Sequence, residues 1–209
     1  MEIFTIGHSN YDVERLVDML RRYNINCVVD IRGTPYSKYN VQYNKEIIQK
    51  TLVREGFVYI YMAKELAAKR INKDSYNEEG YFDFEKVRYE DDFINGIKRL
   101  SNGCEKGYRI ALLGAMQDPI RCHRAILVGR ALRDEGFEVK HILHDYSIGS
   151  QEDIENSLLE KYYKGGYQLT LDSLNDSISR EDMINKGYRA ANKEIGYRIE
   201  HIGENKEKN

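Results

Sequence analysis

Residues 27–35 read CVVDIRGTP, a short apolar run that ends in polar and turn-forming residues. An apolar run rich in β-branched residues is typical of a strand that is buried on both faces of a parallel sheet. Gly33 and Pro35 then end the strand. Because both faces of such a strand need cover, the run predicts an α/β fold with helices on either side of the sheet.

Further apolar segments along the chain extend this sheet. We expect strands over residues 3–7, 57–61, 108–113 and 137–143. Amphipathic patterns between them predict helices over residues 13–20, 44–53, 93–100 and 125–133. Since strands alternate with helices, the connections are right-handed crossovers. The predicted fold is a three-layer, mostly parallel sheet of about five strands with helices on both faces and a C-terminal helical appendage.

A chain of 209 residues is long enough for one sizeable core and short for two ordinary domains. We expect an α/β core that carries the candidate site over 1–145, a helical appendage packed on that core over 146–202, and a disordered tail over 203–209. Ser150 and Asp153 have the spacing of a capping box at the start of an appendage helix. The aperiodic polar stretches 64–83 and 164–178 predict a long loop and a connector.

Bulk composition gives no general attraction to two classes of partner, although a local basic patch remains possible. With 32 basic and 34 acidic side chains, the net charge of −2 gives no general attraction to nucleic acid or to anionic membranes. No apolar run is long enough to cross a bilayer, and the start of the chain lacks the pattern of a signal peptide. The three cysteines, at positions 27, 104 and 122, form neither a disulfide framework nor a metal-binding spacing. A cytoplasmic protein without membrane contact is the expectation.

Ligands of open parallel sheets bind beyond the carboxyl ends of the strands. His8 follows the first predicted strand, Asp30 and Arg32 close the second, and a polar loop leads from the fourth into Cys122-His123-Arg124. These side chains are therefore expected to converge.

The start of a helix, with its unpaired N–H groups, favours an anion next to Arg124. Asp30 and Arg32, at the end of another strand, could bind substrate oxygens. Arg32, Arg124 and Asp30 are therefore the candidate substrate-binding residues. The same surroundings would lower the pKa of Cys122 and make it a nucleophile, with His8 or His123 as acid or base. A plainer interpretation stays open, in which Cys122 packs under the helix, Arg124 pairs with Asp30 or Asp118, and His8 is a turn residue.

Known phosphate-binding loops are missing from the sequence. Neither Gly-x-x-x-x-Gly-Lys-Ser/Thr nor Gly-x-Gly-x-x-Gly follows the first strand. Gly114 ends the fourth strand, where the Cys-x5-Arg motif of phosphotyrosine phosphatases and rhodaneses would begin. The sequence therefore argues against phosphotyrosine-phosphatase and rhodanese chemistry.

Four ordered motifs resemble the domain of unknown function 488 family. They are Thr5-Ile6-Gly7-His8-Ser9-Asn10, Val29-Asp30-Ile31-Arg32 with Pro35 and Ser37, Tyr43-Asn44-Lys45, and Asp118-Pro119-Ile120-Arg121-Cys122-His123-Arg124. The resemblance extends to residues 141–143 and 181–195, and thus covers nearly the whole chain. It implies a cytosolic prokaryotic protein with a three-layer α/β fold and brings no assigned activity. Its motifs add Ser37, Asn44 and Lys45 to the substrate-binding candidates.

The chain departs from the family pattern at two places. Gly114-Ala115-Met116 stands where members commonly carry Cys-Ala-Glu, and Ala67-Ala68-Lys69-Arg70 stands where many carry a loop like Gly-Gly-Arg-Arg. If the replaced thiol and carboxylate act in relatives, this chain has an altered activity. These departures therefore favour a prediction of ligand binding over one of catalysis.

Three hypotheses follow for function. The first is an enzyme that acts on an anionic substrate, either phosphate-containing, nucleotide or nucleic-acid-derived. The second is a non-catalytic nucleic-acid-binding module that uses the Lys and Tyr residues of 38–45 and 64–73. The third and weakest is a metal site built from His8, Asp30, Cys122 and His123, for which no compact ligand spacing exists. The sequence leaves the reaction, the cofactors and the oligomeric state open.

Overall fold

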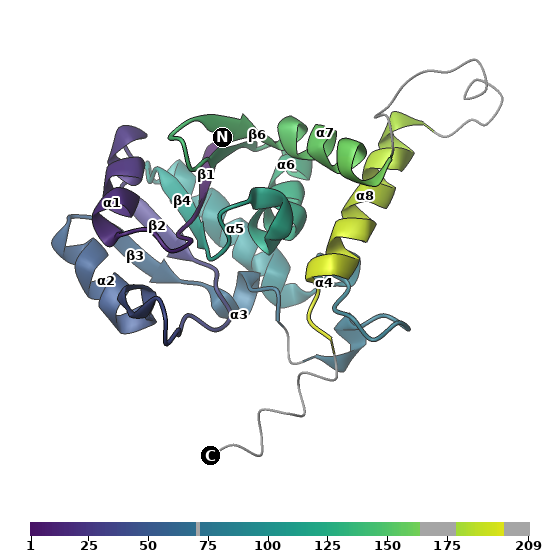
Figure 1. Cartoon of the computed structure of the whole chain (residues 1–209), viewed down its shortest axis with the longest axis horizontal. Helices are drawn as coiled ribbons and strands as arrows, with labels where there is room; N and C mark the ends of the chain where they lie inside the picture. Colours follow the sequence, from purple (N-terminus) through teal and green to yellow (C-terminus); the bar gives the residue numbers. More distant parts are fainter. Residues whose placement is uncertain (70–71, 164–178, 199–209) are drawn as a thin grey trace.

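A six-stranded sheet forms the centre of the part of the chain that the structure, a computed structural model, describes: residues 1–69, 72–163 and 179–198 (Figure 1). The strands are β1 (Glu2–Gly7), β2 (Cys27–Asp30), β3 (Val58–Tyr61), β4 (Ile110–Gly114), β5 (Glu138–Ile142) and β6 (Ile148–Ser150). Their order is β3-β2-β4-β1-β5-β6. All neighbours among β1 to β5 are parallel, and β6 runs antiparallel to β5. The predicted α/β class is confirmed, and β6 is an addition to the expected strands.

Helices cover both faces of the sheet. On one face lie α1 (Val13–Arg22) and α2 (Lys45–Arg54). The opposite face carries α3 (Ala63–Leu66), α4 (Phe84–Val87), α5 (Asp91–Glu105), a π-helix over Arg124–Gly129, α6 (Arg130–Asp134), α7 (Gln151–Tyr162) and α8 (Arg180–Ile195). Figure 1 shows α1 and α2 on one side of the strands and α5 to α8 on the other. This arrangement is the expected three-layer one.

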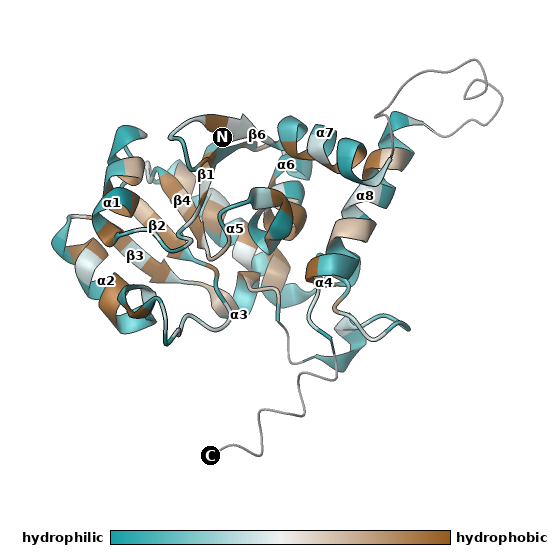
Figure 2. Cartoon of the chain, in the orientation of Figure 1, coloured by the Kyte–Doolittle hydropathy of each residue, from teal (hydrophilic) through white to brown (hydrophobic). Residues whose placement is uncertain are grey.

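Two hydrophobic clusters, one on each face of the sheet, explain why the central strands read as unbroken apolar runs. Successive strand residues point to opposite faces, so Val28 packs with α1 and α2, whereas Val29 packs with the helices of the other layer. All four residues of β2 are buried. In Figure 2 the brown strand segments lie between helices whose outer faces are teal.

The stretch 64–83 differs from the long loop that its polar sequence predicts. It begins inside α3, and Leu66, Tyr76 and Phe82 are buried in the larger hydrophobic cluster. A bridge between Tyr76 and Phe82 closes a small hairpin. The prediction failed because these elements are shorter than one hydrophobic period, so burial in the tertiary structure defines them and no local pattern does.

Both C-terminal helices begin with a capping box. The one predicted at Ser150 and Asp153 is confirmed at the start of α7, and Ser179 and Asp182 form another at the start of α8. The buried side chains of α7 and α8, among them Leu158, belong to the same cluster as the sheet residues. The predicted connector 164–178 and the predicted tail 203–209 lie outside the described residues. Within the described ranges, no helix has both the length and the apolar character needed to cross a membrane.

Candidate functional site

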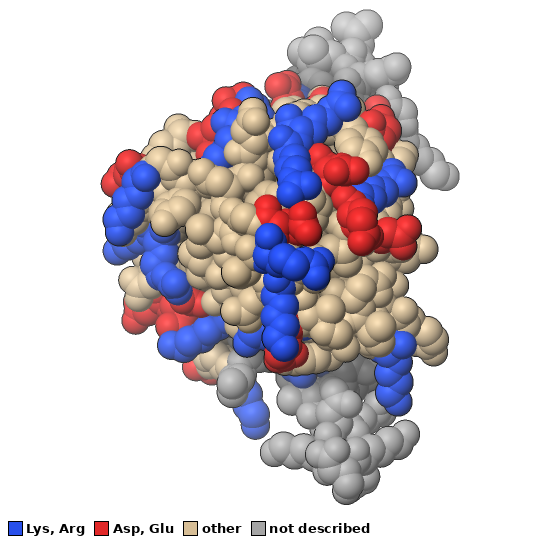
Figure 3. Space-filling view, turned by 90° about the vertical axis from the view of Figure 1, so that its left-hand side faces the viewer, with Lys and Arg blue, Asp and Glu red and all other residues tan. Residues whose placement is uncertain are grey.

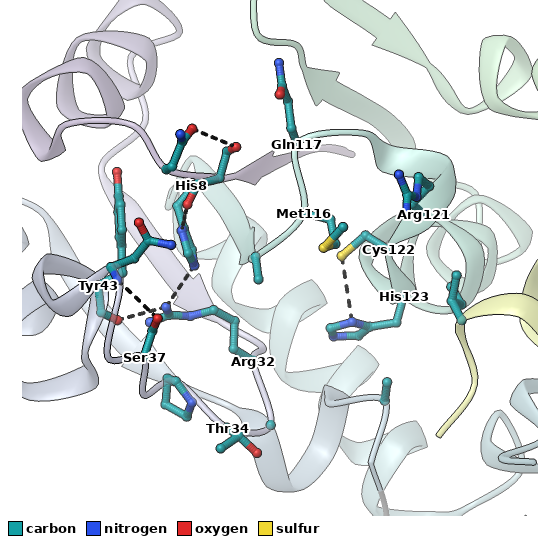
Figure 4. A pocket seen from close by; sticks show the side chains of 18 of the residues that line it. His8, Arg32, Thr34, Ser37, Tyr43, Met116, Gln117, Arg121, Cys122 and His123 are labelled. Carbon is teal, nitrogen blue, oxygen red and sulfur yellow. Dashed lines mark hydrogen bonds between the residues drawn. The ribbon is translucent and has the colours of Figure 1, made fainter. Parts of the chain in front are cut away.

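A pocket of about 880 Å³ opens at the carboxyl edge of the sheet, where the sequence predicts the site (Figure 4). His8 follows β1, Arg32 follows β2, and the loop after β4 contributes residues up to Cys122 and His123. The sequence-predicted side chains of three strand ends therefore meet at one cavity. One further wall, with Tyr197, comes from the segment after α8.

Asp30 and Arg32 form a buried ion pair at the end of β2. The Arg32 guanidinium donates from Nε to Asp30 Oδ1 (2.9 Å) and from Nη2 to Oδ2 (2.6 Å). The Tyr59 hydroxyl donates to Oδ2 at 2.7 Å. Nη1 of Arg32 contacts His8 Nε2 (3.1 Å) and donates to the Tyr43 carbonyl (2.9 Å). Four of the five N–H groups of Arg32 are thus engaged within the protein.

His8 is held as a neutral imidazole. Its Nδ1 lies 2.7 Å from the Ser9 carbonyl, which only accepts, so Nδ1 carries the proton and Nε2 accepts from Arg32. The ring stacks on Tyr43 with centroids 4.0 Å apart. Burial, followed by the charge of Arg32, lowers the pKa of His8 to about 4. Since its acceptor nitrogen is occupied, this geometry gives His8 an orienting part beside Arg32.

Cys122 and His123 form a thiol–imidazole pair at the opposite wall of the pocket (Figure 4). Cys122 Sγ lies 3.8 Å from His123 Nδ1, and His123 Nε2 donates to the Ile31 carbonyl at 3.0 Å. The carbonyl fixes the ring orientation, so Nδ1 faces the sulfur. A nucleophile, a base and a third group that orients the base are the parts that covalent catalysis requires.

Arg124 lies behind this pair and is completely buried. Nη1 donates to the Met116 carbonyl (2.6 Å) and Nη2 to the Gln117 carbonyl (2.8 Å), whereas Nε has no hydrogen-bond partner. Among the described residues, no carboxylate pairs with this guanidinium. Arg124 does not line the pocket, so the structure places its charge next to Cys122 and not at the position of a direct substrate ligand.

The charge of Arg124 changes the pKa of the Cys122 thiol. Burial alone raises the pKa of its thiol, but the Arg124 charge, the His123 side chain and a hydrogen bond from the Arg124 backbone outweigh burial and lower the pKa to about 5. The thiolate is therefore the natural counter-ion of the buried Arg124 guanidinium. Of the three cysteines, Cys122 alone lines the pocket.

The backbone of residues 7–9 contacts the backbone of residues 114–116, and these contacts join two sides of the pocket. The His8 amide donates to the Gly114 carbonyl (3.0 Å) and the Ser9 amide to the Ala115 carbonyl (2.9 Å). A Cβ at Gly7 would lie 1.8 Å from the Met116 oxygen, the same atom that Arg124 binds. Only glycine fits there, because any side chain would displace the acceptor that holds Arg124.

Position 114, at which family members commonly carry cysteine, directly adjoins the thiol. A Cβ at Gly114 would lie 3.0 Å from Cys122 Sγ. Glycine therefore leaves room for the sulfur, and a second thiol at this position would stand beside the first.

The remaining sequence-predicted residues have different positions. Ser37 lines the pocket, and its Oγ accepts from the amides of Tyr39 and Asn40. Asn44 accepts from the Ser37 amide at 2.7 Å, and Lys45 lies over the Tyr61 ring. Neither Asn44 nor Lys45 lines the pocket, but the Asn44 side chain and the Lys45 amide, which donates to the Pro35 carbonyl at 3.0 Å, hold the loop that does.

Most residues that line the pocket were not among the sequence-predicted site residues, and Arg121 and Tyr197 are two of them with a chemically distinctive side chain. Arg121 is exposed at the rim of the pocket (Figure 4), and it belongs to the sequence motif of residues 118–124. Tyr197 lies 75 positions beyond Cys122, in a segment without a motif. Only the path of the chain after α8 brings it to the pocket, so no local signal could have identified it.

The metal hypothesis finds no support in the side-chain geometry. In residues 1–69, 72–163 and 179–198, no three His, Cys, Asp or Glu side chains come together in a way that could hold a metal ion. His8 faces Arg32, and Asp30 is saturated by Arg32 and Tyr59.

Fold and site together define an α/β protein with a pocket, lined by the Cys122 thiol, at the carboxyl edge of a mostly parallel sheet. The sequence profile of the family described as domain of unknown function DUF488 matches residues 12–131, more than half of the chain. The chain therefore belongs to this family. Neither the curated proteins nor the solved structures contain a match.

Proposed function

We propose that the protein is an enzyme that binds an anionic substrate in this pocket and attacks it with the thiolate of Cys122. The observation that carries the proposal is the buried, carboxylate-free Arg124 beside a thiol that also faces His123. A buried charge is costly unless it is paired, so Arg124 favours the thiolate. An inert structural cysteine needs neither a buried positive charge nor an imidazole beside its sulfur.

The reaction class that fits is group transfer through a covalent intermediate. Sγ forms a bond to an electrophilic acyl or phosphoryl centre, and the bond to the leaving group breaks. The leaving group departs with the electron pair and takes a proton from His123 Nδ1. Water then attacks the intermediate, with His123 accepting its proton, and the thiolate is restored.

An anionic substrate is favoured by the cations at the pocket. Arg121 is exposed at the rim, and Arg32 keeps one N–H group after its four internal contacts. Ser37 adds a polar lining group from the loop that Asn44 and Lys45 hold. Phosphate-containing compounds, including nucleotides and nucleic-acid-derived molecules, are the proposed substrates.

The test uses p-nitrophenyl acetate and p-nitrophenyl phosphate as acyl and phosphoryl probes. We expect a burst of p-nitrophenol with one of them, up to one equivalent per chain, and a mass adduct on the peptide that contains Cys122. Cys122→Ser should abolish the burst, whereas Cys104→Ser should retain it, because Cys104 is remote from the pocket. A burst that survives Cys122→Ser, or no covalent adduct with either ester, would contradict the proposal.

The nucleic-acid-binding module remains the second candidate because of one exposed side chain. Tyr39 is 94 % exposed beside Lys38, as a base-stacking residue would be. The rest of the predicted surface does not form a continuous track: Tyr43 is buried against His8, and Lys64 pairs with Asp92. On the face seen in Figure 3, basic and acidic side chains are interspersed. Binding of single-stranded DNA that falls steeply with salt and survives Cys122→Ser would favour this candidate.

A further inference from the structure

We propose that Tyr197 is a specificity residue of the pocket and binds a flat, unsaturated ring on the substrate, next to the centre that Cys122 attacks. The inference rests on the proposed function and deepens it, since it adds a ring to the anionic group. Tyr197 lies outside the residues that the family profile matches, so the family assignment gives it no role.

The backbone of the segment after α8 is firmly anchored. The Phe82 amide donates to the Tyr197 carbonyl (2.9 Å), and Arg198 bridges to Tyr81. The buried Asn192 donates to the Phe82 carbonyl (2.8 Å) and accepts from the Phe84 amide (2.9 Å). These contacts tie the end of α8 to the hairpin beside the pocket.

Gly196 lies close to neighbouring backbone atoms. A Cβ at this position would lie 2.8 Å from the Asn192 carbonyl oxygen and 3.1 Å from the Phe82 carbonyl oxygen. The segment therefore has little freedom, and Tyr197 is delivered to the pocket wall by a rigid backbone.

The side chain of Tyr197 has the exposure that a ring-binding residue needs. It lines the pocket while 43 % of its surface stays exposed. Two other pocket residues present uncovered apolar surface, Met116 with 42 % and Tyr36 with 55 % exposed. The Tyr36 hydroxyl is held by Glu46 at 2.8 Å. Aromatic and thioether side chains of this kind gain most when another flat, apolar group covers them.

Tyr197 also lies within electrostatic reach of the nucleophile. Burial and then the charge of Cys122 raise the pKa of its phenol. The phenol thus stays protonated, and its side chain lines the same cavity as Cys122. A substrate with an electrophilic centre at Cys122 would place the adjoining part of its structure against this ring.

Two alkylating probes of different shape test the inference on the full chain. In both iodoacetamide and N-phenyliodoacetamide, Sγ of Cys122 displaces iodide, which leaves with the electron pair, and a thioether forms. The rate of each probe is divided by its rate with free cysteine at the same pH, so that intrinsic reactivity cancels. The ratio of the two normalised rates is the preference for the ring.

We expect the wild-type chain to prefer the phenyl probe roughly fivefold, the size of an aromatic contact expressed as a rate ratio. Tyr197→Phe should keep this preference, and Tyr197→Ala should lose it, so that the two normalised rates become equal. Tyr89→Ala is the matched control, because Tyr89 is a largely exposed tyrosine outside this pocket.

Each other outcome overturns a defined part of the account. A preference that survives in Tyr197→Ala, or a wild-type chain that alkylates at Cys122 with no preference, overturns the role of Tyr197. Loss of the preference in Tyr197→Phe overturns ring binding in favour of the hydroxyl. If Cys122 reacts with neither probe, the proposed function itself fails, and this inference fails with it.

Discussion

A buried arginine whose partners are carbonyl oxygens, and no carboxylate, sets the chemistry of the site. Arg124 is anchored by the carbonyls of Met116 and Gln117, which fix its position without neutralising its charge. The charge is thereby left for Cys122. Acidic partners would have given an ordinary buried ion pair and an unactivated thiol.

Replacing Arg124 by glutamine should raise the pKa of Cys122 from about 5 towards its ordinary value, because the Arg124 charge is lost while burial remains. The same change leaves two carbonyls without their charged donor and should lower the free energy of unfolding by about 2 kcal/mol. The pH dependence of alkylation measures the first effect and urea unfolding measures the second. Arg121→Gln, on the exposed rim, should change neither quantity; equal shifts in both variants would argue against this role of Arg124.

Sequence patterns identified the members of the site but not their partners. His8, Arg32, Cys122 and His123 could be expected to meet, because they follow the ends of parallel strands. That Arg124 would bind carbonyls depends on the path of residues 114–117, and this path depends on the close approach that Gly7 permits. Such contacts have no signature in the local sequence.

At the scale of elements, the helix that starts at the site begins with a π-turn. In the π-helix over Arg124–Gly129 the Ala125 carbonyl accepts from the Arg130 amide, and Gln151 Nε2 also donates to it at 3.1 Å. Gln151 also donates to the Tyr188 hydroxyl (2.8 Å) and accepts from His141 Nε2 (2.9 Å). One buried amide thus joins β5, α7 and α8 to the π-helix that follows Cys122 and His123.

Gln151→Leu should lower the free energy of unfolding by about 2 kcal/mol, since it removes three buried hydrogen bonds and leaves His141 Nε2 without its partner. Urea unfolding at neutral pH measures this loss. Gln117→Leu is the matched control on an exposed side chain and should stay within about 0.5 kcal/mol of the wild type. A similar small effect for both variants would show that the network contributes little.

The elements that the sequence predicts well are the long or strongly apolar ones. Strands β1 to β5 and helices α1, α2 and α5 follow from hydrophobic period alone. By contrast, β6 has only three residues directly before α7, and its partner is chosen by the preceding turn. The predicted helix 125–133 changes from π to α geometry at Arg130, and its pattern of apolar residues does not mark this change.

At the scale of the whole molecule, three buried groups link folding to pH with the same sign. Burial, and for His8 also Arg32, lowers the pKa of His8 and of His141 to about 4 and about 3, below the 6.5 of a free histidine. The unfolded chain therefore binds protons that the folded chain refuses. Stability from these two groups is fully present above pH 6.5 and is lost as the pH falls towards 4 and 3.

Cys122 contributes in a higher window. Its pKa is about 5 in the folded chain and 9.0 without the fold, so its stabilisation is fully present above pH 9 and is lost as the pH falls to 5. Between about pH 7 and pH 8 the two histidines are neutral in the folded chain and mostly neutral in the unfolded chain, so they add little to the change in stability. Cys27, whose pKa burial raises to about 11, opposes this trend only from near pH 9 upward.

The free energy of unfolding should therefore rise by about 1.4 kcal/mol from pH 7 to pH 8, and Cys122→Ser should remove this rise. Urea unfolding of both chains at the two pH values measures the difference. Parallel pH profiles for the wild type and Cys122→Ser would mean that the thiol has the same pKa in the folded and unfolded chain.

The central claim is that Arg124 and His123 hold Cys122 as a thiolate, and the rate of iodoacetamide alkylation at Cys122 as a function of pH tests it most directly. Mass analysis of the Cys122 peptide separates this thiol from Cys27 and Cys104, whose pKa values burial raises. The account predicts a midpoint at about pH 5. A midpoint near the value of about 8.5 that is typical of an unperturbed cysteine would contradict it.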